Sequence, residues 1–560
     1  MKKKLSCLII ALAMLAGMSG CSDGSAGTDT SSSAKYNMTL TLWLPTSENT
    51  TDAAITKVEN AINKITKKNY KTAVEIHAIE DDKYEETIKQ KTLEVEKSEK
   101  ENAAAEAERK KAEREARRRG ETVSRAETET TDVESAVVVT DENGDSVVEE
   151  VYPSVKTNQI DVFCIRGYDD FVYYTDNGYV LPVDETLTTS SKLLRSYIYP
   201  TFLEAGQRGG STYAIPNSHV IGEYTYLLIN KKLCDSLYYD PSMFNSLTDC
   251  QQFIEDVGAT SSVTPLVSET TLPGLKYWGS DSSPKFSVLG TIVSDEVDVS
   301  TRLNIRNVFG LKKYTESLTM LKELREKGYL STDVDGATSF GVAVMNSTAK
   351  DIKKYENDYY IKVLQKPRAE SEDMYQSMFA VSAYTLDMSR SMELITLINT
   401  DSTIRTLLQY GVEGTHWEKD KDANGEETIK IISDEYQMDL INTGNVFITY
   451  PGEGLPMSYW DDGRQQNIDS LASPFLGFSV DKNDEENAKY FENLKELDEY
   501  SATIFARVDA MTAAEFTESL SALKDEVAAS KAYNDNLDSN DFDSLISRYS
   551  SFYDETYGQN

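Results

Sequence analysis

The sequence predicts an α/β protein with a largely parallel sheet and more than one hydrophobic core. Alternating apolar residues at 38–45 are typical of a strand, an amphipathic helix follows at about 52–67, and further strands are expected at about 74–79 and 160–165. This order of strands and helices indicates parallel strands joined by crossover helices. With 560 residues, the chain is long enough for two or more cores of ordinary size.

The N-terminus has the order of a secretory signal peptide. Three lysines at 2–4 precede an apolar run over 5–18, which is too short to span a bilayer comfortably. Ser19 and Gly20 stand directly before Cys21 and resemble the lipobox of bacterial lipoproteins. We therefore expect cleavage before Cys21 and acylation of its side chain; ordinary cleavage nearby and a retained anchor helix are the alternatives.

The chain is strongly acidic. It has 57 lysines and arginines against 93 aspartates and glutamates, and losing the three leader lysines takes the net charge from −36 to −39. Such a surface repels nucleic-acid phosphates and anionic lipid headgroups. We therefore expect no nucleic-acid partner, and we expect membrane attachment through acyl chains only.

Cysteine and histidine usage gives no support for a metal site or a redox centre, and no cofactor is expected. Besides Cys21, the mature part keeps Cys164, Cys234 and Cys250, with no C-x-x-C motif and only three histidines in the whole chain. Cys234 and Cys250 are expected to be buried free thiols, with a disulfide between them as the alternative.

One segment opens like a calcium-binding loop. Residues 420–425 read Asp-Lys-Asp-Ala-Asn-Gly, but the twelfth position is Ile431, where a bidentate glutamate is needed. The Asn424-Gly425 pair instead predicts a hairpin turn.

A long charged segment interrupts the α/β pattern. Residues 84–119 contain no glycine or proline, and beyond Val95 the only apolar side chains are alanines, which predicts a helix of about 50 Å that is partly solvated. An acidic linker over 121–134 then leads to a hairpin with Asn143-Gly144 at its turn. We expect 99–158 to be a solvated arm inserted in the first lobe, with partner binding as the alternative.

Strands and helices continue to alternate after residue 187. The pattern predicts strands at 213–216, 224–230 and 375–383, and helices at 389–398, at 401–410 with Asp401 as N-cap and Gly411 just past its end, and at 541–552.

Several short segments carry a family resemblance. They are Ile-Asp-Val-Phe at 160–163, Gly-Tyr-Val-Leu-Pro-Val-Asp at 178–184, Tyr-Ala-Ile-Pro-Asn at 213–217, the run at 224–230, Leu-Ile-Asn-Thr-Asp at 397–401, the run at 410–417, Thr-Gly-Asn at 443–445 and Ser-Pro-Phe-Leu-Gly-Phe at 473–478. No single segment is specific. Together with the motif at Cys21, the ordered set resembles the extracellular solute-binding proteins of carbohydrate ABC importers, the maltose-type group, especially its large Firmicute lipoproteins.

The resemblance implies an α/β, two-lobed periplasmic-binding fold of type II, with three crossing strands at the hinge and the long helix and β-hairpin as an added arm. It implies crossings near 216–224, 374–383 and 445–451. The expected layout is a lipoprotein signal peptide at 1–21, a flexible tether at 22–36, an N-terminal lobe at 37–216 (with the arm 99–158) and 377–446, and a C-terminal lobe at 217–376 and 447–560.

The function that the resemblance implies is capture of a sugar or oligosaccharide for the permease subunits of an ABC transporter. The protein would be a monomer, lipid-anchored on the outer face of the cytoplasmic membrane, and not an enzyme. The same fold binding a peptide, a polyamine or a metal chelate is the first alternative. An exported glycoside hydrolase and an adhesion lipoprotein are less favoured, because no pair of acids is singled out and no hydrolase motif appears.

Ligands of open parallel sheets lie at the carboxyl ends of the strands, which directs attention to 45–48 and 166–170. Sugars offer hydroxyls to planar polar groups and C–H faces to aromatic rings. The candidate contacts are Arg166, Tyr168 and Asp169 as the strand-end cluster, Trp43 at the end of the first strand, Asn217 and Glu223 beside the first crossing, and Trp278 and Trp460 on loops of the second lobe. A core position is the alternative for Trp43, and core positions are expected for His416 and Trp417.

Overall fold

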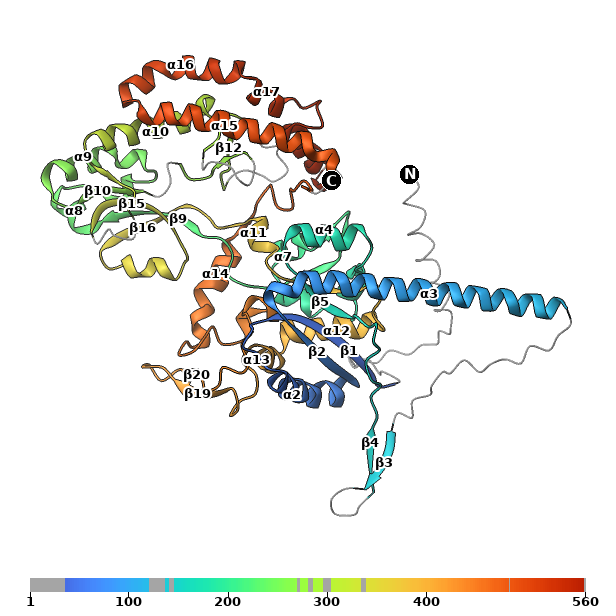
Figure 1. The fold of residues 1–560 in the computed structure, drawn as a ribbon. Helices are drawn as coiled ribbons and strands as arrows, with labels where there is room; N and C mark the ends of the chain where they lie inside the picture. Colours follow the sequence, from blue (N-terminus) through green and yellow to red (C-terminus); the bar gives the residue numbers. More distant parts are fainter. Residues whose placement is uncertain are drawn as a thin grey trace. The chain divides into compact units, whose positions relative to one another are not determined.

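The computed structural model divides into two compact units (Figure 1). It describes residues 36–119, 136–140, 146–268, 272–279, 286–295, 304–333, 339–482 and 484–557. Unit 1 comprises the chain up to residue 218 and residues 375–457, and unit 2 comprises residues 219–374 and the chain from residue 458. Cys21 and the leader lie outside the described residues, so acylation stays a prediction. No helix in the described ranges has the length and apolar composition of a membrane span.

Unit 1 is built on a five-stranded sheet with the order β2-β1-β5-β18-β8. The strands are β1 (Met38–Thr46), β2 (Thr72–Glu80), β5 (Val162–Ile165), β8 (Ala214–Pro216) and β18 (Met378–Val381). β1 runs parallel to β2 and β5, which confirms the predicted parallel pattern, whereas β18 is antiparallel to both β5 and β8. Every residue of β1 is buried, as expected for a strand covered on both faces.

The helices of unit 1 begin and end where the sequence signals stand. α2 (Asp52–Tyr70) joins β1 to β2, and Thr51 accepts a hydrogen bond from the Ala54 amide at its start. α12 (Met388–Thr400) and α13 (Ser402–Tyr410) follow β18. The Asp401 carboxylate accepts from the first amides of α13, and Gly411 ends it with φ of 76°, so the predicted N-cap and terminating glycine are confirmed.

The long charged helix is α3 (Tyr84–Arg118), and its two halves differ in burial. The first half buries one stripe, made of Tyr84, Ile88, Thr92 and Val95. From residue 99 to 119, every side chain that the structure describes is exposed except Glu113, which is half-buried. This confirms a helix with a solvated second half, and Figure 1 shows that half extending away from the sheet of unit 1.

The predicted hairpin is also confirmed, and the segment that follows it is held by hydrogen bonds. β3 (Ala136–Thr140) pairs antiparallel with β4 (Ser146–Glu150); the turn itself lies outside the described residues. Three hydrogen bonds then hold 151–153 against the start of β1 and against α2: the Val151 carbonyl accepts from Asn37 at 3.0 Å, the Pro153 carbonyl accepts from Thr39 at 2.6 Å, and Tyr152 donates to the Lys67 carbonyl at 3.1 Å.

These contacts define which part of the arm can be removed. Replacing residues 99–149 by a short Gly/Ser linker should leave the midpoint of thermal unfolding within about 2 °C of the wild type, because the replaced helix half buries almost nothing. A replacement extended to 158 also deletes the 151–153 contacts and should lower the midpoint further. Differential scanning calorimetry on both variants tests this, and unfolding of the shorter replacement at room temperature would show that the arm supports the lobe.

Unit 2 has its own five-stranded sheet with the order β14-β10-β15-β9-β16. The strands are β9 (Tyr224–Asn230), β10 (Thr264–Ser268), β14 (Leu330–Ser331), β15 (Phe340–Ser347) and β16 (Tyr359–Gln365). β10 is parallel to β14 and β15, while β9 is antiparallel to β15 and β16. The helices α9 (Gln251–Thr260) and α10 (Lys312–Glu326) contribute Phe253, Ile254 and Leu324 to the core on one face of this sheet.

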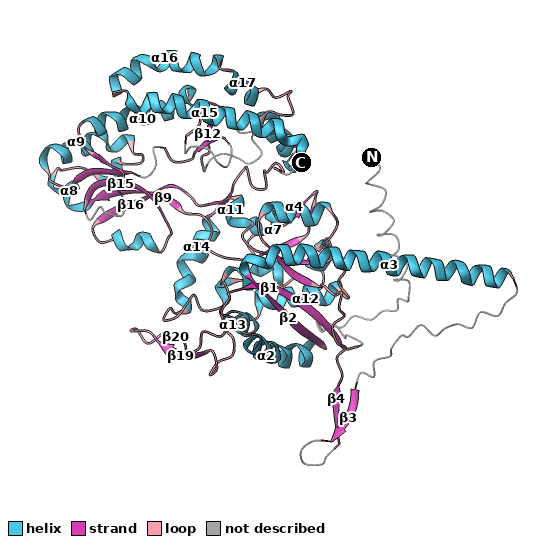
Figure 2. Ribbon diagram, viewed as in Figure 1, coloured by secondary structure: helices cyan, strands magenta, loops and turns pink. Residues whose placement is uncertain are grey.

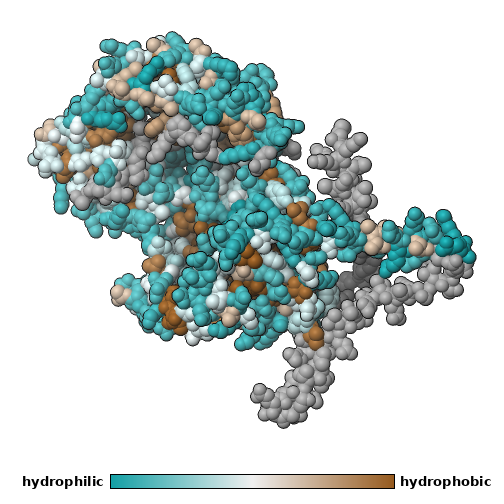
Figure 3. Space-filling view, viewed as in Figure 1, coloured by the Kyte–Doolittle hydropathy of each residue, from teal (hydrophilic) through white to brown (hydrophobic). Residues whose placement is uncertain are grey.

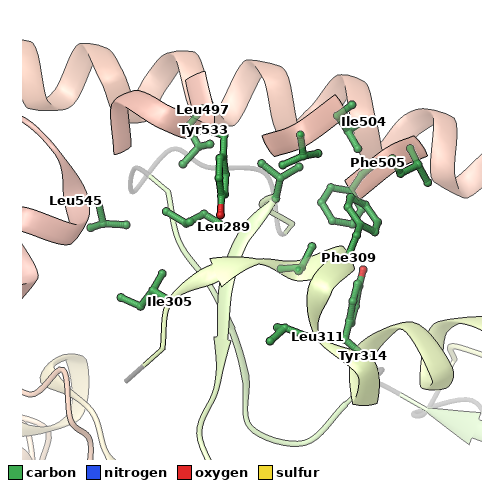
Figure 4. Close-up of a cluster of buried hydrophobic side chains, with 14 of the residues drawn as sticks. Leu289, Ile305, Phe309, Leu311, Tyr314, Leu497, Ile504, Phe505, Tyr533 and Leu545 are labelled. Carbon is green, nitrogen blue, oxygen red and sulfur yellow. The ribbon is translucent and has the colours of Figure 1, made fainter. Parts of the chain in front are cut away.

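The C-terminal helices cover a smaller sheet of unit 2. They are α15 (Ala488–Ala510), α16 (Ala513–Ala529), α17 (Lys531–Leu537) and α18 (Leu545–Tyr557), and the sheet consists of β11 (Leu275–Tyr277), β12 (Leu289–Ile292) and β13 (Arg306–Asn307). Figure 4 shows Ile504 and Phe505 of α15 facing Phe309. The Tyr533 hydroxyl accepts from the Asn307 amide at 2.9 Å. α18 confirms the last predicted helix, with a later start.

Shorter elements complete both units (Figure 2). In unit 1 these are α4 (Tyr168–Asp176), α5 (Asp184–Thr188), α6 (Leu194–Tyr197), α7 (Pro200–Ala205), β6 (Gln207–Arg208), β7 (Ser211–Thr212), β19 (Trp417–Lys421) and β20 (Glu427–Ile431). In unit 2 they are α8 (Lys231–Ser236), β17 (Arg368–Ala369), α11 (Ser371–Met374), α14 (Asp461–Asp469) and β21 (Leu471–Ala472).

Several local predictions are settled by these elements. β19 and β20 form an antiparallel hairpin around 422–425, as the Asn424-Gly425 pair predicts. His416 and Trp417 are buried, as expected. Cys234 and Cys250 are free and fully buried, and burial raises their thiol pKa values to about 11 and about 12.

Glu393 on α12 gives a pH dependence to the stability of unit 1. Burial raises the pKa of this half-buried carboxyl to about 7, from 4.5. The folded protein therefore holds a proton that the unfolded chain has lost between pH 4.5 and 7, so the free energy of unfolding falls as the pH rises through this window. Glu393→Gln should remove that loss and unfold at a higher temperature than the wild type at pH 8, with little difference at pH 4.5. Parallel melting curves for both proteins across this range would contradict the assignment.

Candidate functional site

Polar residues line a pocket of about 340 Å³ in unit 1, at the carboxyl ends of β1 and β2. The lining residues are Pro45, Thr46, Ser47, Asp81, Gln437, Met438 and Asp439. The first three close β1 and continue from it, and Asp81 directly follows β2. The pocket thus lies at the sheet edge where ligands of open parallel sheets bind, and we call it the strand-end pocket.

Residues 437–439 form the pocket wall opposite β1, and the backbone of Gln437 is hydrogen-bonded to the residues that follow β1. The Gln437 carbonyl accepts from the Ser47 amide at 3.3 Å and from the Thr50 hydroxyl at 2.9 Å, and the Gln437 amide donates to the Thr50 oxygen at 3.0 Å. These bonds fix two segments that are 387 residues apart in sequence at Thr50 and Gln437.

A buried arginine is hydrogen-bonded to the segment that continues this wall. Arg405 on α13 is fully buried and donates to the carbonyls of Leu440 at 2.6 Å and Asn445 at 3.1 Å, and to the Gln409 amide oxygen at 3.2 Å. Burial lowers its pKa to about 9. The segment after Asp439 is therefore anchored by a rigid, planar donor.

Arg166 forms an ion pair with Asp81, the carboxylate on the other side of the pocket. It follows β5 and forms ion pairs with Asp81 and with Glu85, whose carboxylate oxygen lies 2.6 Å from Nε. Its guanidinium lies 5.4 Å from the centre of the Tyr84 ring. Burial lowers the pKa of Arg166, but the two carboxylates outweigh it and the net shift is upward. Arg166 therefore positions Asp81, whose side chain stays 65% exposed.

Tyr168 and Asp169 lie beside Arg166 but do not line the pocket. Gly167, with φ of 86°, turns the chain from β5 into α4, and its amide donates to the Tyr375 carbonyl at 2.6 Å. The Tyr168 ring packs edge-on against Tyr375 at 4.8 Å, and burial raises the pKa of its hydroxyl. Asp169 is exposed in the first turn of α4.

Trp43 and Asn217 lie in the interior of unit 1. Trp43 is 7% exposed and stacks on His77 with ring centres 4.0 Å apart. Asn217 is fully buried and donates to the Ser377 hydroxyl and to the Ile441 carbonyl, each at 2.9 Å.

The remaining candidates lie in unit 2 on separate elements. Trp278 follows β11, is half-buried, and packs edge-on against Phe475 at 4.2 Å. Trp460 is 7% exposed and contacts Tyr459 edge-on at 5.5 Å. Glu223 is exposed, directly before β9.

Unit 2 also contains a smaller pocket, which sequence reasoning did not find. It has a volume of about 170 Å³, and its lining includes the aromatic rings of Tyr277, Phe286, Tyr314 and Phe505. Lys322 reaches it from α10 and donates to the Val508 carbonyl at 2.5 Å. A volume of this size accommodates a single ring.

Asp81, Gln437 and Asp439 were also missed from the sequence. The signal for Asp81 was present, because it directly follows a predicted strand, as Ser47 does. Gln437 and Asp439 follow no strand or helix signal in the sequence, and long-range contacts with Arg405, Ser47 and Thr50 hold their segment at the sheet edge.

The chemistry of the strand-end pocket is that of a hydroxyl acceptor. The exposed carboxylates of Asp81 and Asp439 accept hydrogen bonds and disfavour an anionic ligand. Within the described ranges, no group of three His, Cys, Asp or Glu side chains gathers as a metal site. The geometry therefore suits a neutral or cationic polar ligand rich in donors.

Comparison with known proteins gives one curated relative and several solved structures. No family model matches the chain. A carbohydrate ABC transporter substrate-binding protein of Streptococcus pneumoniae serotype 4 (strain ATCC BAA-334 / TIGR4) is 22% identical over 352 residues, which cover 58% of this chain and 68% of that protein. The crystal structure of the N-glycan transport solute binding protein (NgtS) from Streptococcus pneumoniae matches with a TM-score of 0.51 and 14% identity, covering 93% of this chain and 100% of that one.

These matches confirm the predicted fold, which is that of the two-lobed solute-binding proteins. They also confirm the likeness to substrate-binding proteins of carbohydrate ABC transporters that the sequence motifs indicate. Both relatives are transport proteins, in agreement with the prediction that the chain is not an enzyme.

Proposed function

We propose that this chain, which has the fold of a solute-binding protein, captures a sugar or oligosaccharide outside the cell for uptake by an ABC importer. The observation that carries the proposal is the strand-end pocket, with Asp81 and Asp439 exposed at the edge of a parallel sheet. Carboxylates in such a position accept hydrogen bonds from sugar hydroxyls. The class of ligand is supported by the curated relative, a carbohydrate transporter component.

The proposal includes the place of the protein and its partners. We place it on the outer face of the cytoplasmic membrane as a monomer, anchored through acylated Cys21 and delivering its ligand to permease subunits. Cys21→Ser should then release the protein from membranes of the native host. Unchanged membrane association would argue for a retained helix instead.

The proposal also includes closure of two lobes on the ligand. The chain passes between the units after residues 218, 374 and 457, so three crossing segments would act as the hinge. Tyr168, Asp169, Glu223, Trp278 and Trp460 remain proposed ligand contacts, together with Trp43, Arg166 and Asn217.

A ligand panel tests the function. Neutral oligosaccharides, oligopeptides and polyamines are each added in excess over the purified chain, and the midpoint of thermal unfolding is measured. A ligand at a hundred times its Kd adds about 2.7 kcal/mol to the free energy of unfolding, which is a shift of several degrees. We expect shifts with oligosaccharides. A shift with peptides or polyamines alone would replace the sugar by that class.

Asp81→Asn tests the site. The substitution removes the charge while keeping the size of the side chain, and a lost hydrogen bond to a charged group costs about 1.5–3 kcal/mol, or roughly 10- to 150-fold in affinity. Asp82→Asn is the matched control, because Asp82 is exposed on the same turn but does not line the pocket. Equal affinities of the two variants for the sugar would show that the sugar does not bind in the strand-end pocket.

A further inference from the structure

The exposed half of α3 carries a cluster of positive charge on an otherwise acidic protein. Residues 109–119 contain seven lysines and arginines against two glutamates, in a chain with a net charge of −36. Figure 3 shows this part of the surface as mostly hydrophilic. We call the exposed basic side chains of Arg109, Lys110, Lys111, Arg114, Arg118 and Arg119 the basic tip.

Three members of the basic tip have no acidic partner among the described residues. Lys110 pairs with Glu106 at 2.6 Å, and Arg109 lies 3.7 Å from Glu113. Lys111, Arg114 and Arg118 form no ion pair with any residue that the structure describes, and all three side chains are exposed. Their charges are thus available to an external anion.

The acidic body does not cancel this charge. Val95 is the last fully buried position of α3, and Arg118 lies 23 residues further along the helix, or about 35 Å at 1.5 Å per residue. The Debye length is about 8 Å at physiological ionic strength, so the basic tip lies several screening lengths from that position. The charge of the acidic residues around Val95 is therefore largely screened at the end of the basic tip.

We propose that the basic tip of α3 binds the phosphate headgroups of an anionic phospholipid bilayer. The lysine and arginine side chains of the tip would form ion pairs with the phosphodiester groups of the lipids. A bilayer is favoured over a single soluble anion because six cations spread along a helix match a continuous array of charge. Between Val95 and the end of α3, alanines are the only apolar side chains. The contact with the bilayer is therefore superficial, electrostatic and reversed by salt. The tip thus adds a second membrane contact to the proposed acyl anchor, while the binding itself is independent of that anchor and of the ligand.

Vesicle sedimentation tests the proposal with residues 22–560, which carry no acyl group. The vesicles contain either phosphatidylcholine alone or phosphatidylcholine with 30% phosphatidylglycerol, an amount on the order of that in anionic membranes. The variant K111Q/R114Q/R118Q neutralises three cations with a good helix former. The matched control K57Q/K64Q/K68Q makes the same change of charge on exposed side chains of α2 in the same unit.

We expect the wild type and the control to bind anionic vesicles equally and to release them in 0.5 M salt, where the Debye length shrinks to roughly 4 Å. Each lost cation should weaken partition roughly fivefold, so the tip variant should bind about a hundredfold more weakly. Three results overturn the proposal: equal binding of tip variant and wild type, wild-type binding to neutral vesicles, or wild-type self-association in sedimentation velocity that the tip variant loses. The last would identify the acidic surface of a second copy as the occupant.

Discussion

Asp161→Asn should lower the free energy of unfolding by about 3–5 kcal/mol, although the two side chains have nearly the same shape. Asp161 is fully buried and accepts five hydrogen bonds. One carboxylate oxygen accepts from the Thr41 amide at 2.9 Å, the Thr41 hydroxyl at 3.1 Å and the Gln159 side chain at 2.7 Å. The other accepts from the Thr385 hydroxyl at 2.8 Å and the Leu386 amide at 2.9 Å.

The cost arises because an asparagine has only one acceptor oxygen. In either orientation its amide group faces two or more donors, which then lose their partner; the three donors to one oxygen are buried and the two donors to the other are part-buried. Thr385→Val is the graded control, since it removes a single donor and should cost about 1–2 kcal/mol. Urea unfolding followed by circular dichroism measures both values, and an Asp161→Asn variant within 1 kcal/mol of the wild type would show that the network is not what joins β1, β5 and the segment after β18.

Trp278→Ala should lower the free energy of unfolding of the empty protein by about 3 kcal/mol. The Trp278 ring packs against Phe475 at 4.2 Å and against Tyr549 at 5.9 Å, so truncation leaves a cavity beside the C-terminal helices. Trp278→Phe keeps a ring there and should cost less than about 1.5 kcal/mol.

The same pair of variants separates packing from ligand stacking. A tryptophan that only stacks on a sugar would leave the stability of the empty protein unchanged on truncation and lower only the affinity. Unchanged urea unfolding of Trp278→Ala would therefore contradict the packing role and favour the ligand contact proposed from the sequence.

Local signals were sufficient for most elements of the sheet and its helices. The alternation at 38–45, the N-cap Asp401 and the Asn-Gly turns each act within a few residues, and each element is present. The antiparallel direction of β18 was not predicted, because its pairing with β5 joins residues that are more than 200 positions apart. Ile160-Asp-Val-Phe stands out as a motif in the sequence, but the role of Asp161 depends on donors from two distant segments, at Thr41 and at 385–386.

The candidate site was less predictable for the same reason. Arg166 was placed correctly at a strand end, yet its partners Asp81 and Glu85 come from the turn after β2 and from α3. Alternation did not decide the side of Trp43, since both faces of a parallel strand are buried. The basic tip of α3 was hidden by the net charge of the chain, which averages over parts that lie several Debye lengths apart.

Isothermal titration calorimetry with a neutral oligosaccharide from the ligand panel tests whether the chain binds a sugar in the strand-end pocket. We expect saturable binding with one site per chain, recovery of the sugar chemically unchanged from the complex, and weakening by Asp81→Asn but not by Asp82→Asn. Saturable binding of a peptide with no heat from any sugar, or release of hydrolysed sugar, would contradict it.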